Sequence, residues 1–226
     1  MKFATLAMMA ALGGCVSVGP KLKPVQMYRF GFTPDLLDKS NLTPVPGAGM
    51  PPVGIVFGTV TFPQDSSGDR ITTIDGNEVS YVSQARWTAP AQELFNEAIG
   101  QGFARTAQSV RLESRGPSAA GYRLDIAVRQ FESVYDSHNK PTVSIALDAR
   151  IIRLEDKAVV GQRFIDADVP VGRNDMSLTA DAYNKATTQA VAALIGFSED
   201  TMAAQEGVQT PSVEQPSDGK QHVEGL

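Results

Sequence analysis

The sequence predicts an α+β fold, in which a single domain has an antiparallel sheet with two helices packed on one face. Several segments alternate apolar and polar residues, or are rich in β-branched and aromatic residues, and both patterns favour strands. Two other segments repeat apolar residues at intervals of three and four, which is typical of amphipathic helices. Along the chain these segments follow the order strands, helix, three strands, helix.

The first part of the domain is predicted to be mostly extended. Residues 27–30 (MYRF) form a short candidate strand, and residues 53–62 (VGIVFGTVTF) have the β-branched and aromatic character of a longer one. Residues 70–74 and 78–82 flank an Asp-Gly pair at 75–76, which is the signal of a type I′ hairpin turn. We therefore expect two strands and a hairpin before the first helix.

Each of the two helices is predicted from a cap and an apolar stripe. Thr88 can cap the first helix, with Pro90 in its first turn, and Ser177 can cap the last helix, which Gly196 can end. The stripe of the first helix is Leu94, Phe95, Ala98, Ile99, Gly102 and Phe103. The stripe of the last helix is Tyr183, Ala186, Ala190 and Leu194.

Between the helices the chain predicts a meander of three antiparallel strands. Residues 122–128 and 143–151 alternate apolar and polar side chains, as half-buried strands do. Residues 158–169 form the third candidate strand, which is entered through the turn at 155–157 (EDK). These strands complete the expected sheet.

The N-terminus has the pattern of a bacterial lipoprotein signal. Lys2 precedes an uncharged apolar run at 3–12, which is too short to span a bilayer. It leads into Leu12, Gly13, Gly14 and Cys15, which match the lipobox and predict cleavage before Cys15 and acylation of that residue. The alternative is a buried helix with an incidental cysteine. Cys15 is the only cysteine in the chain, and a lone cysteine in an exported protein indicates pairing or modification.

The predicted organisation has four parts: a signal peptide at 1–14, a lipidated tether at 15–26, one domain at 27–197 and a disordered polar tail at 198–226. Two or three acyl chains anchor a protein firmly, since each buried methylene contributes ~0.8 kcal/mol. Loss of Lys2 reduces the 20 basic residues to 19 against 25 acidic ones, a net charge of −6. This charge argues against a nucleic-acid partner.

The sequence offers no catalytic, metal or cofactor site. His138 lies in a predicted turn and His222 in the tail, and neither has a neighbour at metal-ligand spacing. Asp166 and Asp168 would point to the same side of a strand, which suits either a carboxylate pair or, more simply, a solvated strand face. We therefore expect a protein that is not an enzyme and has no cofactor.

Arg86 and Trp87, directly before the first helix, are the local feature that stands out. In one interpretation Trp87 fills the core at the strand-to-helix corner, and Arg86 caps a carbonyl or pairs with a carboxylate. In the other the pair contacts a partner protein, because tryptophan and arginine are enriched at interface hot spots. The sequence leaves both interpretations open.

Three segments around this pair resemble the ABC-type transport auxiliary lipoproteins. They are residues 69–71 (DRI), 79–81 (VSY) and 86–90 (RWTAP), in which a strand leads to an arginine-tryptophan corner and then to an amphipathic helix. The resemblance extends over residues 27–197, and later positions are also similar: Tyr122, Leu124 and Phe131, ahead of the strand at 143–150. The family includes the paraquat-inducible C lipoprotein.

The resemblance implies a non-catalytic lipoprotein that works beside an ABC transporter of the MCE type. Its implied partners are an MCE-domain protein and the transporter subunits, which move phospholipid or other hydrophobic molecules between the inner and outer membranes. The alternatives are an assembly or activator lipoprotein for an outer-membrane or cell-wall machine and, less favoured, a periplasmic enzyme. Whether the protein forms homo-oligomers is left open.

The residues after Cys15 bear on its location. Val16 and Ser17 stand where an aspartate commonly retains bacterial lipoproteins in the inner membrane. We therefore expect a lipid-anchored protein of the outer membrane that faces the periplasm.

Overall fold

The computed structural model describes residues 24–37, 51–113 and 120–208 of the chain. The signal peptide, Cys15 and most of the tether lie outside these residues, as does the tail from residue 209 onward. The elements in chain order are β1 (Gln26–Tyr28), the 3-10 helix η1 (Pro34–Leu36), β2 (Val53–Thr61), β3 (Arg70–Asp75), β4 (Glu78–Trp87), α1 (Ala91–Thr106), β5 (Val110–Glu113), β6 (Tyr122–Tyr135), β7 (Pro141–Arg153), β8 (Val159–Pro170) and α2 (Met176–Val208). The α+β architecture with two helices is confirmed.

The described strands form one sheet that forks at β6. On one side of β6, antiparallel β7 and then β8 complete the predicted meander. On its other side, the first half of β6 pairs with β2, which continues to β5, and its second half pairs with β3, which continues to β4 and β1. The pairs β1–β4, β2–β5, β2–β6 and β3–β6 are parallel, so the sheet is mixed and not wholly antiparallel as expected.

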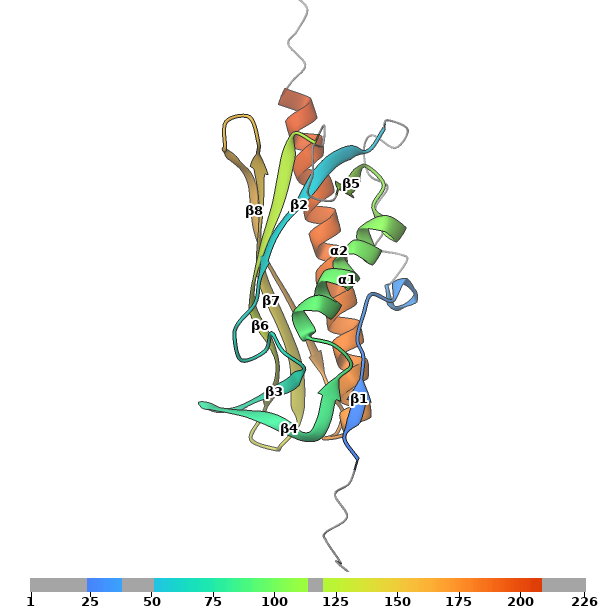
Figure 1. Cartoon of the computed structure of the whole chain (residues 1–226), viewed down its shortest axis with the longest axis vertical. Helices are drawn as coiled ribbons and strands as arrows, with labels where there is room; N and C mark the ends of the chain where they lie inside the picture. The colour runs from blue at the N-terminus through green and yellow to red at the C-terminus, as the bar shows by residue number, and fades with distance from the viewer. Residues whose placement is uncertain (1–23, 38–50, 114–119, 209–226) are drawn as a thin grey trace, which may run out of the picture.

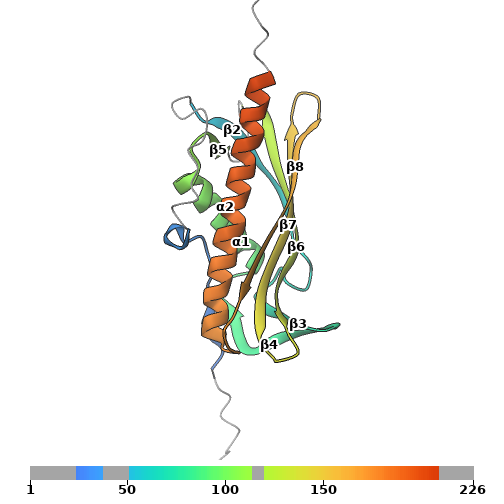
Figure 2. The ribbon, with the colours of Figure 1, turned by 180° about the vertical axis from the view of Figure 1, so that it is seen from behind.

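Both helices cover the same face of this sheet, and α2 runs along nearly the whole length of the molecule (Figures 1 and 2). The predicted stripes of both helices are buried in the core. Gly102 allows the helices to approach closely, because a Cβ at this position would collide with Val191 of α2. The sequence pattern therefore identified the packed faces of both helices correctly.

The ends of the helices differ from the prediction. The first helix begins at Ala91, after Pro90, and its first N–H groups donate to the carbonyls of Gly68 and Ser67 at 2.9 and 3.3 Å instead of to Thr88. Asp175, and not Ser177, caps α2, because its Oδ1 accepts from the N–H groups of residues 177 and 178. The free N–H groups at the start of α1 are thus satisfied by a turn that is distant in sequence, and those at the start of α2 by a neighbouring carboxylate.

The last helix also passes Gly196 and continues to Val208, so residues 198–208 belong to α2 and not to a disordered tail. The hairpin between β3 and β4 has the expected two-residue loop, in which Gly76 has a φ of +57°. Asn77 does not have a positive φ, and a positive φ at the first loop residue alone is the type II′ pattern rather than type I′.

Candidate partner-contact site at the arginine-tryptophan corner

The corner is built from three segments that are distant in sequence. The N-terminal strap, residues 24–37, contributes β1, which pairs in parallel with the last three residues of β4. The Thr88 N–H donates to the Tyr28 carbonyl at 2.8 Å, and the Trp87 N–H donates to the Asp69 carbonyl at 2.8 Å. These bonds join the strap and the start of β3 to the end of β4, directly before α1.

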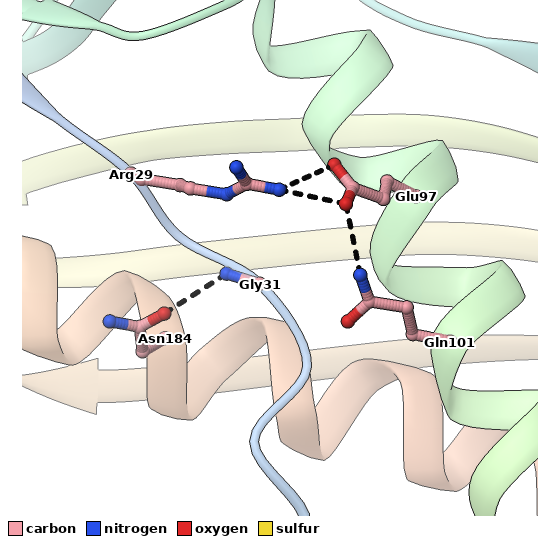
Figure 3. Close-up of polar contacts among 5 residues, drawn as sticks. All are labelled: Arg29, Gly31, Glu97, Gln101 and Asn184. Atoms are coloured by element: carbon pink, nitrogen blue, oxygen red, sulfur yellow. Dashed lines mark hydrogen bonds and ion pairs between the residues drawn. The ribbon is translucent and has the colours of Figure 1, made fainter.

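The strap is also joined to both helices by side chains (Figure 3). The Arg29 Nη2 atom lies 2.7 Å from each carboxylate oxygen of Glu97 on α1, and Gln101 Nε2 donates to the same carboxylate at 2.9 Å. The Gly31 N–H donates to Asn184 Oδ1 on α2 at 3.0 Å. The strap therefore lies across α1 and α2 and is bonded to each.

Buried rings fix the strap further and enclose Trp87. The Trp87 side chain is 1% exposed, and its ring centroid lies 4.9 Å from those of Phe30 and Tyr183, in edge-to-face geometry. Phe131 of β6 contacts Phe30 and Tyr183 at 5.0 and 5.2 Å. Aromatic pairs in this geometry stabilise by ~0.5–1.5 kcal/mol beyond their buried area. Trp87 is thus a core residue, which corrects its interpretation as a surface anchor.

Arg86 has a different environment from its neighbour. Its side chain is 41% exposed, and Nη1 lies 3.6 Å from Asp69 Oδ1. On the adjacent strand, Arg70 pairs with Arg86 in register, and its guanidinium carbon lies 3.7 Å from the centre of the Tyr81 ring. Arg86 therefore pairs with a carboxylate and also remains accessible at the surface.

The backbone bulges beside this cluster. Between the pairs Arg70–Arg86 and Thr72–Tyr81, one residue of β3 faces four residues of β4. Gln84 lies in this bulge with a φ of 58°, a conformation that costs a non-glycine residue free energy. The bulge leaves the surface charges of Asp69, Arg70 and Arg86 grouped at the base of the hairpin.

The three segments that carried the family resemblance therefore meet at one place. The family described as "ABC-type transport auxiliary lipoprotein component" matches residues 36–195, which include most of the described domain. The chain belongs to this family. Among curated proteins none matched it.

Solved structures share the fold of this auxiliary lipoprotein. A crystal structure of a Xanthomonas campestris protein is 23% identical, with a TM-score of 0.67, and the match covers 82% of this chain and 100% of that one. A second crystal structure, of an uncharacterized protein, is 10% identical with a TM-score of 0.59, and the match covers 77% and 98% of the two chains. The chain is a lipoprotein of the cell envelope by family, and no helix among its described residues is long and apolar enough to cross a membrane.

The other residues singled out in the sequence lie apart from the corner. His138 lies in the β6–β7 turn with its side chain 81% exposed, and Asp136 in the same turn accepts hydrogen bonds from the N–H groups of His138 and Lys140. The bond from Lys140 contributes most to lowering the pKa of Asp136. Asp166 and Asp168 are exposed on β8, where Asp168 accepts from the Ser144 hydroxyl at 2.6 Å.

Residues of the predicted anchor are not part of the described structure: Leu12, Gly13, Gly14 and Cys15 all lie outside it, and so does His222. In the described ranges, no group of three or more histidine, cysteine and acidic residues is arranged to hold a metal ion. The anchor therefore stays a prediction from the sequence.

Burial raises the pKa values of one residue on β6 and of one on α2. Desolvation raises the pKa of Glu132 on β6, and the negative charge of Asp65 raises it further. Burial also raises the pKa of Tyr183, whose hydroxyl lies 3.4 Å from Ser133 Oγ. Both effects follow because removal from water disfavours the charged form of an acidic group.

A cavity of about 300 Å³ lies near the C-terminal end of α2 and was not predicted. Its lining includes Arg153, whose guanidinium donates to Asp156 at 3.0 Å and to Gln205 at 2.7 Å. The other lining residues are Val53, Gly121, Tyr122, Glu155, Met202 and Gln205. No sequence pattern indicated the cavity, because Met202 and Gln205 lie in the segment that was interpreted as a tail.

Proposed function

We propose that the chain is a non-catalytic auxiliary subunit of an MCE-type ABC transporter, which moves phospholipid or other hydrophobic molecules between the inner and outer membranes. In this proposal Cys15 carries the acyl chains, and the protein is anchored in the outer membrane and faces the periplasm. Arg86, at the exposed corner, contacts the MCE-domain protein. The family match over residues 36–195 is the observation that carries the proposal.

Two features of the structure support a role in binding. The family segments converge on the β3–β4 hairpin, where Asp69, Arg70 and Arg86 form a charged surface above a rigid aromatic core. Arginine is enriched among residues that dominate protein interfaces. The strap begins nine positions after Cys15 and pairs with the end of β4 that carries Arg86, so the proposed contact surface lies beside the described segment that is nearest in sequence to the proposed anchor.

Purification of the tagged full-length protein from its native envelope tests this function. We expect the MCE-domain protein, the permease and the ATPase to co-purify, as identified by mass spectrometry. A different tagged lipoprotein from the same membrane is the control for non-specific recovery. Enrichment of a cell-wall synthase or an outer-membrane assembly machine, without the transporter subunits, would instead support the alternative function.

A further inference from the structure

Four of the seven large apolar side chains that the described structure exposes belong to elements that meet at one end of the molecule. They are Val25, Met27, Val79 and Leu178, with exposed fractions of 51%, 54%, 50% and 36%. Val25 and Met27 belong to the start of the strap, Val79 is the second residue of β4 after the β3–β4 loop, and Leu178 lies in the first turn of α2. Figures 1 and 2 show these elements together at the end of the molecule where the described strap begins. We call this the proximal end.

The opposite end of the molecule differs. It is formed by the β7–β8 hairpin and the C-terminal part of α2 (Figures 1 and 2). Of the seven exposed apolar residues, Val159, at the start of β8, lies beside this hairpin. Phe164 lies in the middle of β8, and Leu36 lies in the 3-10 helix of the strap. Exposed apolar residues therefore gather at the proximal end.

The length of the chain outside the structure identifies what lies next to this end. Eight residues, 16–23, lie between Cys15 and Pro24, where the described strap begins. Fully extended, they span at most ~30 Å. The 33 residues of α2 extend for ~50 Å, from the proximal end to the opposite one. An acyl anchor on Cys15 therefore holds the proximal end close to the bilayer.

We propose that the proximal end rests on the lipid bilayer, with Val25, Met27, Val79 and Leu178 at the boundary between headgroups and acyl chains and α2 directed away from the membrane. This inference rests on the proposed acylation of Cys15. The charged residues in the turns at this end are Asp75, Glu78, Asp136, Asp175, Lys140 and Arg173. Four of these residues are acidic and two are basic, so the turns carry a net negative charge and are not attracted to anionic lipid. The proposed attraction is therefore the contact of the apolar side chains with the bilayer, whatever the charge of its lipids.

The chain itself permits a direct test, because acylation of Cys15 removes its only free thiol. The acylated full-length protein is reconstituted into phosphatidylcholine vesicles as the single variants Val79→Cys, Leu178→Cys and Val159→Cys, each labelled with a polarity-sensitive fluorophore. Val159→Cys is the matched control, since Val159 is as exposed as Val79 but lies at the opposite end. Quenching is measured with aqueous iodide and with a phospholipid that carries a nitroxide near its headgroup.

We expect iodide to quench the labels at 79 and 178 several-fold less than the label at 159, and the nitroxide lipid to quench them several-fold more. If all three labels respond alike in vesicles that float with the protein, the orientation is wrong although the anchor is right. If 79 and 178 escape both quenchers, contact between protein copies replaces the bilayer and the proposal is also wrong. If the protein does not float with the vesicles, the acyl anchor itself fails, and the orientation fails with it.

Discussion

Arg86 and Trp87 show how two adjacent residues of one strand acquire different roles. Successive side chains of a strand point to opposite faces, so the burial of Trp87 directs Arg86 outward. The sequence predicted the corner but not which interpretation applied to each residue. That choice depends on Phe30 and Tyr183, which lie far from Trp87 in sequence and reach it only in the folded chain.

Charge reversal at the corner tests the partner contact. Exposed ion pairs like the one between Arg86 and Asp69 contribute ~0–1 kcal/mol to stability, so Arg86→Glu should leave the melting temperature near that of the wild type. We expect it to abolish co-purification of the MCE-domain protein. Arg163→Glu is the matched control, because Arg163 is 46% exposed and lies 3.3 Å from Asp200 on another surface. A stable Arg86→Glu protein that retains its partner would remove the corner from the interface.

Trp87→Ala should lower the melting temperature in the same assays, in contrast to Arg86→Glu. Truncation of a buried aromatic residue costs ~3–5 kcal/mol in free energy of unfolding. Partner binding should then fail only under conditions in which the domain unfolds. Comparison of the two variants separates a surface role from a packing role at neighbouring positions.

At the scale of elements, local patterns predicted most of the strands and both helical stripes, whereas strand pairing was less accessible. Alternation reports which side of a strand is buried but not the direction of its neighbour, so the four parallel pairs were missed. The four-residue strand β5 was too short to produce a pattern. Length and long-range pairing thus limited the prediction of the sheet.

The end of α2 was missed for a different reason. Residues 198–201 are all polar, which suggested a tail, yet three of the four, Ser198, Glu199 and Thr201, are buried and hydrogen-bonded. The hydroxyls of Ser198 and Thr201 donate to carbonyls one helical turn earlier, at 2.8 and 2.7 Å. Glu199 accepts from the N–H groups of Gln108 and Ser109 at the end of α1. Polar residues satisfied in this way extend the core in a manner that hydrophobic periodicity does not reveal.

Glu132, near the C-terminal end of β6, should make the stability of the domain depend on pH. Because the pKa of Glu132 is raised from its usual 4.5, the folded state binds a proton more tightly than the unfolded state between these two pKa values. Stability should therefore fall as pH rises through this window, and Glu132→Gln should remove the loss. We expect the melting temperature of Glu132→Gln to exceed that of the wild type at pH 7 and to match it at pH 4, as measured by scanning calorimetry.

Glu78→Gln, at the exposed start of β4, is the control for replacing a glutamate by its amide. It should leave the melting temperature unchanged at both pH values. If Glu132→Gln raises the melting temperature equally at pH 4 and pH 7, the removed charge is not the cause, and a packing effect of the amide replaces the electrostatic explanation.

At the scale of the whole molecule, one sulfur atom is proposed to hold the protein at its membrane. Cys15→Ala should abolish acylation, so that a metabolic palmitate analogue no longer labels the protein and the precursor keeps its signal peptide. In the wild type we expect label and protein together in the outer-membrane fraction after density-gradient separation. Label that persists on Cys15→Ala would contradict the anchor, and a wild-type protein mainly in the inner membrane would contradict the sorting.

The strap has a mechanical consequence. A force applied through the proposed acyl anchor would enter the domain through β1, which lies parallel to the end of β4. A pull along β1 loads these backbone hydrogen bonds in shear, so they bear the force together and are not peeled apart one at a time. Beyond β1, the same load reaches the ion pair between Arg29 and Glu97 of α1, the buried ring of Phe30 and the bond from Gly31 to α2. Extraction of the strap therefore requires the core to open, so tension applied at the start of the strap would not unravel the domain from that end.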